Sequence, residues 1–164
     1  MMRNGRIKNM VRNYPEAVIE VLDDDIQYPL AVTDAMKSFA ETNPWKGSQN
    51  LRKKKFQRLN RDLARACSIQ EPTLEFGLLD NGSSGASYYR PRDHRIVLVG
   101  KLSVVTYLHE FAHALGFDEE AACRWSINLF RRCFPRQYSR LIHVGHTLLR
   151  PQDISAMLTG QSVR

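Results

Sequence analysis

The segment that most constrains this chain is His109-Glu110-Phe111-Ala112-His113, an H-E-x-x-H pattern. Residues four apart lie one above the other on an α-helix, so His109 and His113 present two imidazoles on one face. Two imidazoles at this spacing can hold one Zn²⁺ ion. Glu110 is rotated by about 100° from His109, which places its carboxylate at the flank of such a metal, where it can accept a proton from water. The alternative is an ordinary helix that carries two incidental histidines.

The residues around this pattern predict an amphipathic helix. Neither proline nor glycine occurs between Lys101 and Leu115, and Gly116 provides a helix end. Apolar side chains recur every three to four residues on the face opposite the two histidines, at Val104, Leu108, Phe111 and Leu115. One face of the helix is therefore expected to pack in a core, and the other to carry the histidines.

A catalytic zinc site usually has three protein ligands and one open position, so the two histidines leave one ligand to be found. Three acidic residues, Asp118, Glu119 and Glu120, begin the next predicted helix. Glu119 is the predicted third ligand, because it shares a helical face with the small residues Ala122 and Ser126, which let the two helices lie close together. Glu120 is the second choice, and Asp118 is better suited to an N-cap. A further alternative is that all three only favour the helix dipole.

The rest of the chain predicts an α+β fold, in which a three-stranded sheet with a β-hairpin packs on the H-E-x-x-H helix. Helices are expected at residues 14–22, from 33 or 34 to 40, and at 51–67, 102–115, 118–133 and 137–149; strands are expected at 73–79, 86–89 and 95–99. His94 lies in the hairpin turn and is expected to be a surface residue. Residues 1–48 are assigned to an N-terminal helical extension, 49–150 to the core and 151–164 to a C-terminal tail.

Charge and cysteine content limit the class of protein. The 164 residues carry a net charge of +7, and no apolar run is long enough to cross a membrane. Cys67, Cys123 and Cys133 are widely spaced and form no C-x-x-C pair, so neither a disulfide framework nor a cysteine zinc site is expected. No apolar signal-peptide region follows the basic N-terminus. We therefore expect a reduced, cytoplasmic protein without a membrane partner.

Much of the positive charge falls on the predicted helix at residues 51–67. Its polar face carries Arg52, Lys53, Lys54, Lys55, Arg58, Arg61 and Arg65. One interpretation is a helix that contacts the phosphates of a nucleic acid. The other is a solvated outer face on a helix of the core.

The H-E-x-x-H segment and the residues after it resemble the zincin metallopeptidases. Within them, the chain resembles gluzincins with small cores, such as the ImmA/IrrE family of repressor-cleaving peptidases. The similarity rests on residues 109–113 and 119–126, where Glu119 is followed three residues later by the small residue Ala122. The order helix, strand, hairpin, metal helix and glutamate helix, over about residues 51–134, is also similar. The gap between His113 and Glu119 is short, and metzincins have His or Asp where this chain has Glu119.

The resemblance implies a zincin-like core and a Zn²⁺-dependent peptidase. His109, His113 and Glu119 would hold the metal, Glu110 would be the general base, and the substrate would be a protein or peptide. The edge of the expected hairpin at residues 86–99 could bind such an extended peptide by strand addition. Tyr138, His143 and His146 are candidates for stabilising the oxyanion. One alternative is a basic nucleic-acid-associated protein, including a protease that acts on DNA-bound proteins as in SprT-like zincins. Another is a non-catalytic component of an assembly.

Overall fold

The computed structural model describes residues 22–77, 86–144 and 147–149, with the side chains of 142–149 excluded. Within them the fold is α+β, as predicted, with five α-helices, a three-stranded mixed sheet and a separate pair of short strands. The helices are α2 (Leu30–Glu41), α3 (Gln49–Ala66), α4 (Val104–Ala114), α5 (Glu119–Cys133) and α6 (Pro135–Tyr138). The strands are β1 (Thr73–Gly77), β2 (Tyr88–Arg90), β3 (Arg95–Val99), β4 (Ile142–Val144) and β5 (Thr147–Leu149).

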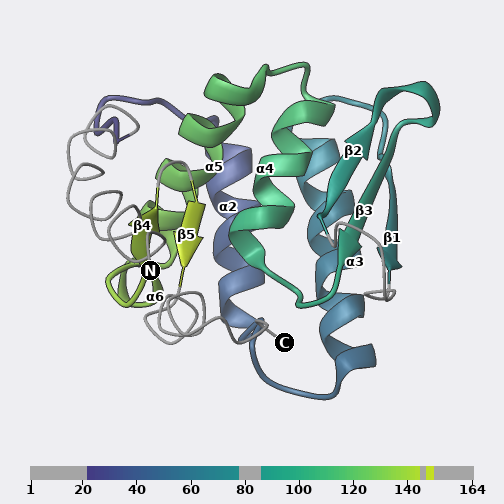
Figure 1. Cartoon of the computed structure of the whole chain (residues 1–164), viewed down its shortest axis with the longest axis horizontal. Coiled ribbons are helices and arrows are strands. Elements are labelled where there is room, and N and C mark those ends of the chain that lie inside the picture. Colours follow the sequence, from purple (N-terminus) through teal and green to yellow (C-terminus); the bar gives the residue numbers. More distant parts are fainter. Residues whose placement is uncertain (1–21, 78–85, 145–146, 150–164) are drawn as a thin grey trace, which may run out of the picture.

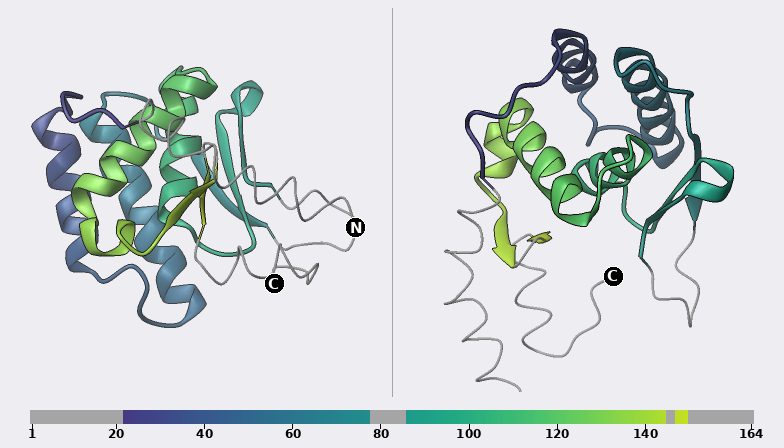
Figure 2. Two further views of the ribbon diagram at one scale, coloured as in Figure 1. Left: turned by 60° about the vertical axis from the view of Figure 1, so that its left-hand side comes forward. Right: turned by 90° about the horizontal axis from the view of Figure 1, so that it is seen from above.

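The long helices lie in two layers. Helices α2 and α3 form one pair, α4 and α5 form the other, and α2 contacts α5 between the layers (Figure 1, Figure 2). The three-stranded sheet borders both layers, because β1 contacts α3 while β2 and β3 contact α4. The sheet therefore packs on the H-E-x-x-H helix, as the sequence predicted. No helix in the described part of the chain is both long and apolar enough to cross a membrane.

The sheet has the order β1-β3-β2. Strand β1 runs parallel to β3, and β2 pairs antiparallel with β3 in the predicted hairpin, so β2 is an edge strand. The hairpin turns through a short 3-10 helix at Pro91–Asp93 and through His94, which has a φ of 50°. The His94 ring contacts the Tyr89 hydroxyl through Nδ1 (2.8 Å) and the Gln70 carbonyl through Nε2 (2.7 Å). Both ring nitrogens of His94 are thus used to hold the turn.

Aromatic side chains connect the helices of the core. Phe56 of α3 meets Phe39 of α2 and Tyr107 of α4 edge to face, with ring centroids 5.4 and 5.7 Å apart. Phe111 of α4 stacks on Trp125 of α5 at 6.2 Å. Such pairs each contribute about 0.5–1.5 kcal/mol beyond the burial of their area. Helix α2 thus shares one core with α3, α4 and α5, so the described part of the assigned N-terminal extension packs directly on the assigned core.

Some predicted elements differ from the observed ones. The predicted helix at 137–149 is wrong: α6 ends at Tyr138, and β4 and β5 form an antiparallel hairpin. The β-branched residues Ile142, Val144 and Thr147 favour extended backbone, which explains the difference. Helix α2 begins at Leu30, before the predicted start, because its first turn is closed by a bond from the Val32 N–H to the Pro29 carbonyl (2.9 Å). The predicted helix at 14–22, apart from Leu22, and the tail at 151–164 lie outside the described residues.

Candidate metal centre

Helix α4 is anchored by its apolar face. The predicted core positions Val104, Leu108 and Phe111 are buried, and Leu115 is partly buried against the same core. The helix begins at Ser103, whose Oγ accepts a hydrogen bond from the Thr106 N–H. With this face fixed, the opposite face carries the histidines toward solvent.

A buried hydrogen-bond chain adds to this anchoring. The Tyr107 hydroxyl lies 3.0 Å from the Oδ1 atom of Asn60 in α3, and Asn60 donates to the Pro72 carbonyl at 2.8 Å. Buried polar groups stabilise a fold only when all of them are hydrogen-bonded, and a missing partner leaves a costly unpaired group. These two hydrogen bonds therefore fix the rotation of α4 relative to α3 and the start of β1. The same rotation sets the direction in which the histidines of α4 point.

The turn at the end of α4 favours one tautomer of the His113 ring. Gly116 has a φ of +91°, and the bonds Gly116 N–H to His113 carbonyl (2.9 Å) and Phe117 N–H to Ala112 carbonyl (3.1 Å) form a Schellman motif. This turn brings the Phe117 carbonyl to 2.9 Å from His113 Nδ1. Because a carbonyl oxygen only accepts, Nδ1 carries the proton and the Nε2 atom of neutral His113 keeps its lone pair.

Helix α5 begins where the sequence placed it. Asp118 is the N-cap, as predicted, and its Oδ1 accepts from the Ala121 N–H at 2.8 Å. Ala122 and Ser126 are buried, in agreement with the predicted close approach of α5 to α4. Glu119 is the first residue of α5, so its side chain lies close to the end of α4.

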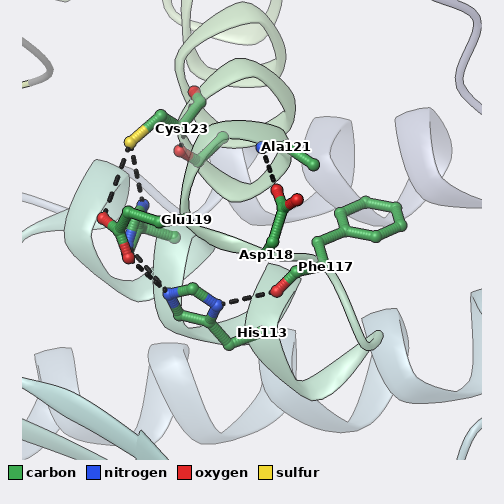
Figure 3. A network of polar contacts seen from close by, with 8 residues as sticks. His113, Phe117, Asp118, Glu119, Ala121 and Cys123 are labelled. Carbon is green, nitrogen blue, oxygen red and sulfur yellow. Dashed lines mark hydrogen bonds and ion pairs between the residues drawn. The ribbon is translucent and has the colours of Figure 1, made fainter.

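The three predicted metal ligands lie together. The Nε2 atoms of His109 and His113 are 3.1 Å apart, and Glu119 places Oε1 3.1 Å from His109 Nε2 and Oε2 3.2 Å from His113 Nε2. Figure 3 shows the Glu119 carboxylate between His113 and Cys123. The Glu119 side chain is 73% exposed and the two histidine side chains 20% and 23%, so the centre is supported from within and open to solvent on one side.

These distances fit a zinc ion. Zinc bonds of about 2.0–2.1 Å in tetrahedral geometry separate neighbouring ligand atoms by roughly 3.3 Å. The three observed separations of 3.1–3.2 Å are close to that value. Two imidazoles and one carboxylate are also a ligand set that catalytic zinc sites use.

The neighbouring acidic residues have other contacts. Glu120 pairs with Arg124 across one helical turn at 3.7 Å, and its side chain is 81% exposed. Asp118 is occupied in capping α5. Of the three acidic residues considered from the sequence, Glu119 is the one whose carboxylate meets both histidines.

Glu110 points into the protein beside this centre. It is only 8% exposed, and burial raises the pKa of its carboxyl group to about 7, with a smaller contribution from Glu119. His113 and a hydrogen bond from the backbone N–H of Tyr89 act in the opposite direction and lower that pKa. The carboxylate is thus held between α4 and the edge strand β2, within electrostatic reach of two candidate ligands.

Cys123 is a further member of the centre, which the sequence analysis missed when it excluded a cysteine zinc site. Its Sγ lies 3.7 Å from His109 Nδ1 and 3.8 Å from Glu119 Oε1. Donor atoms of His109, Glu119 and Cys123 lie within 4.8 Å of one another, so they form a second donor set that overlaps the first. Burial and the nearby Glu119 carboxylate raise the pKa of the Cys123 thiol to about 11. The spacing of Cys123 from Glu119, four residues along one helix, was the available signal.

An open pocket of about 510 Å³ adjoins the centre. Its walls come from β2 and the following turn on one side and from the end of α4 on the other: Tyr89, Pro91, His113, Ala114, Gly116 and Phe117. The candidate ligand His113 is part of this lining. A group in the pocket would therefore lie next to the centre.

The candidates for stabilising an oxyanion are not brought to the centre by any described contact. Tyr138 lies in α6 and packs against the hydrophobic core, where burial raises the pKa of its hydroxyl. His143 lies in β4, but its side chain is outside the described part of the chain, as is the whole of His146. This assignment stays a prediction.

The cations of α3 are largely engaged within the protein. Arg52 donates to the carbonyls of Pro44 (2.9 Å) and Leu102 (3.0 Å). Lys55 Nζ donates at 2.8 Å to two carbonyls, those of Asn43 and Lys46. Arg58 pairs with Asp62 at 3.7 Å, and Lys53 lies 5.5 Å from the centre of the Phe76 ring. Four of the seven predicted phosphate-contacting side chains thus have intramolecular partners.

Comparisons of the chain with protein-family models, with curated proteins and with solved structures found no match. A function therefore has to be inferred from the chemistry of the centre itself.

Proposed function

We propose that this chain is a zinc-dependent metallopeptidase of the zincin type, in which His109, His113 and Glu119 hold Zn²⁺. One observation carries the proposal: the two Nε2 atoms and the Glu119 carboxylate approach one another to 3.1–3.2 Å. An ionised carboxylate has only acceptor atoms, and His113 Nε2 is an acceptor because Nδ1 donates to the Phe117 carbonyl. Acceptors crowded around one point are stabilised by a cation between them, and this nitrogen and oxygen set suits zinc.

When bound, zinc polarises a carbonyl group and lowers the pKa of a water molecule. The chain itself supplies the proton transfer. Glu110 accepts a proton from the attacking water and delivers it to the leaving amine, which is general acid–base catalysis. Its burial and the Tyr89 N–H hold the carboxylate in one orientation beside His113.

The surroundings of the centre favour an extended protein or peptide substrate. Strand β2 is an edge strand, and its residue Tyr89 contacts Glu110, so a peptide added along this edge would run past the general base. The pocket beside His113 is lined by Tyr89, Pro91 and Phe117 and suits an apolar side chain of that peptide. Metal, base and substrate strand would then meet at one place.

The nucleic-acid alternative gains no support from α3, because four of its cations contact groups within the protein. Salt-dependent binding to DNA that survives Glu110→Gln would nevertheless favour it. The assembly alternative would be favoured by complexes that form independently of Glu110 and are lost on deletion of residues 1–48.

The first test is the zinc content of the purified chain after loading and dialysis, measured by elemental analysis. We expect about one zinc per chain in the wild type and in Glu120→Ala, and loss of zinc in His109→Ala, His113→Ala and Glu119→Ala. Glu120 is the matched control, because it is an exposed glutamate in the same helical turn. A wild type that takes up no zinc would overturn the proposal, and zinc retained by Glu119→Ala would remove Glu119 from the ligand set.

The second test is hydrolysis of an unstructured protein such as casein by the zinc-loaded chain. We expect cleavage that a chelator stops and that added zinc restores. If the chain bound stoichiometric zinc but cleaved neither casein nor a peptide library, it would be a zinc-binding protein without peptidase activity. That result would contradict the peptidase proposal.

A further inference from the structure

Cys123 contacts two candidate zinc ligands at once. Its Sγ lies 3.7 Å from the Nδ1 atom of His109 and 3.8 Å from the Oε1 atom of Glu119 (Figure 3). The residue is 3% exposed, so the protein fixes the thiol and solvent does not compete for its contacts. A neutral thiol has one hydrogen to donate and lone pairs to accept, which is what a bridge between these two groups requires.

The protons can be assigned from the partners. The Glu119 carboxylate has no hydrogen to give, so the Cys123 S–H donates to Oε1. With a metal at Nε2 of His109, the imidazole hydrogen lies on Nδ1 and is donated to the lone pairs of the Cys123 sulfur. In that tautomer the Nε2 lone pair of His109 points toward His113 and Glu119.

The two histidines are then oriented in the same way. His113 has its Nδ1 hydrogen held by the Phe117 carbonyl, and His109 has its Nδ1 hydrogen held by the Cys123 sulfur. We infer that Cys123 is a positioning residue, which holds His109 in the tautomer and Glu119 in the rotamer that the metal needs. This inference rests on the proposed zinc centre.

The geometry favours positioning over direct ligation. Cys123 approaches His109 from Nδ1, whereas the atom that faces His113 and Glu119 is Nε2. The overlapping donor set of His109, Glu119 and Cys123 does not contain His113. A sulfur ligand would therefore require His109 to bind through its other nitrogen, with loss of the contact between the two Nε2 atoms.

The test compares zinc affinity, by chelator competition, in the wild type, Cys123→Ala, Cys123→Ser and Cys133→Ala. Removing an outer-shell partner of a ligand typically costs about 10–100-fold in metal affinity, and we expect this loss in Cys123→Ala. Serine also donates and accepts, so Cys123→Ser should recover most of the affinity. Cys133→Ala removes a partly buried thiol from the other end of α5 and should bind zinc like the wild type. Unchanged affinity in Cys123→Ala, or equal loss in Cys123→Ala and Cys123→Ser, would overturn the positioning role.

Two further measurements use protein whose metal content has been established, so that failure of metal binding and failure of the Cys123 role give different results. In the zinc-loaded wild type, NMR of the imidazole nitrogens should show the hydrogen of His109 on Nδ1, beside the Cys123 sulfur. In the cobalt-loaded wild type we expect no thiolate-to-cobalt charge-transfer absorption. Its presence would make Cys123 a ligand, and a His109 that binds the metal through Nδ1 would exclude the proposed bridge.

Discussion

The junction of α4 and α5 and the exposed face of α3 are both rich in ionisable side chains, but they use them differently. At the junction, His109, His113 and Glu119 converge on one another at 3.1–3.2 Å. On α3, cations such as Arg52 and Lys55 diverge, each toward backbone carbonyls of adjacent segments. The junction therefore resembles a binding centre, whereas these α3 cations connect parts of the fold.

Side chains that converge on one point indicate a binding site better than a high density of charge does. The seven cations of α3 suggested a phosphate-contacting helix because they are numerous. A helix distributes consecutive residues around its axis, however, so these side chains do not point at one place. The candidate ligands are only three, and they are recognised because two histidines one helical turn apart meet a glutamate from another helix. Variants that remove one group at a time should separate these two uses of charge.

The largest expected effect concerns chemistry at the junction. Glu110→Gln keeps the size of the side chain and removes the base, so we expect peptide hydrolysis to fall by about 10²–10⁴-fold. Zinc content should not change, because Glu110 is not among the proposed ligands. The measurement is the rate of casein cleavage alongside elemental analysis, with Glu120→Gln as the exposed control. Activity retained by Glu110→Gln would contradict the role of Glu110 as the general base at the junction.

The second effect concerns the α3 face. Arg52→Ala removes hydrogen bonds from a charged donor to the Pro44 and Leu102 carbonyls, and we expect it to lower the free energy of unfolding by about 2 kcal/mol. Lys54→Ala changes an exposed cation of the same helix and should stay within about 0.5 kcal/mol of the wild type.

Urea unfolding measures both values, and fluorescence anisotropy with duplex DNA at several salt concentrations provides the second readout. Equal stability of the two variants would contradict the structural role of Arg52. If Lys54→Ala instead weakened a salt-dependent binding to DNA, the α3 face would be a binding surface after all.

The smallest expected effect distinguishes the N-cap Asp118 from the adjacent candidate ligand Glu119. Asp118→Ala removes the N-cap of α5 and should cost about 1 kcal/mol of stability. Zinc binding should persist, because Asp118 is not one of the proposed ligands. Thermal unfolding and zinc titration of Asp118→Ala and Asp118→Asn would check this, and asparagine, which also caps helices, should restore stability. Loss of zinc in both variants would indicate that Asp118 is a metal ligand rather than only an N-cap.

Local periodic patterns predicted most of the fold near the centre. The α5 helix, the β3 strand, the Asp118 cap and the core face of α4 follow from residues adjacent in sequence, and all are observed. The predicted helix at 137–149 failed where β-branched residues compete with an apolar spacing. Helix spacing predicted the candidate site but gave no role to Cys123, whose contacts with His109 and Glu119 depend on how α5 packs on α4.

Spacing along the chain is enough to predict that two imidazoles lie on one helical face, because the rise and twist of an α-helix are the same everywhere. The sequence therefore predicted this part of the candidate site before any tertiary contact was known. It also limited the candidates for a third ligand to three consecutive acidic residues. The tertiary structure shows that, of these three, Glu119 has the carboxylate that lies next to both histidines, because the Gly116 turn and the packing of Ala122 and Ser126 set where α5 begins relative to α4. It also decided the partners of the α3 cations and the place of Cys123, because contacts between distant segments depend on how the helices pack rather than on spacing along the chain.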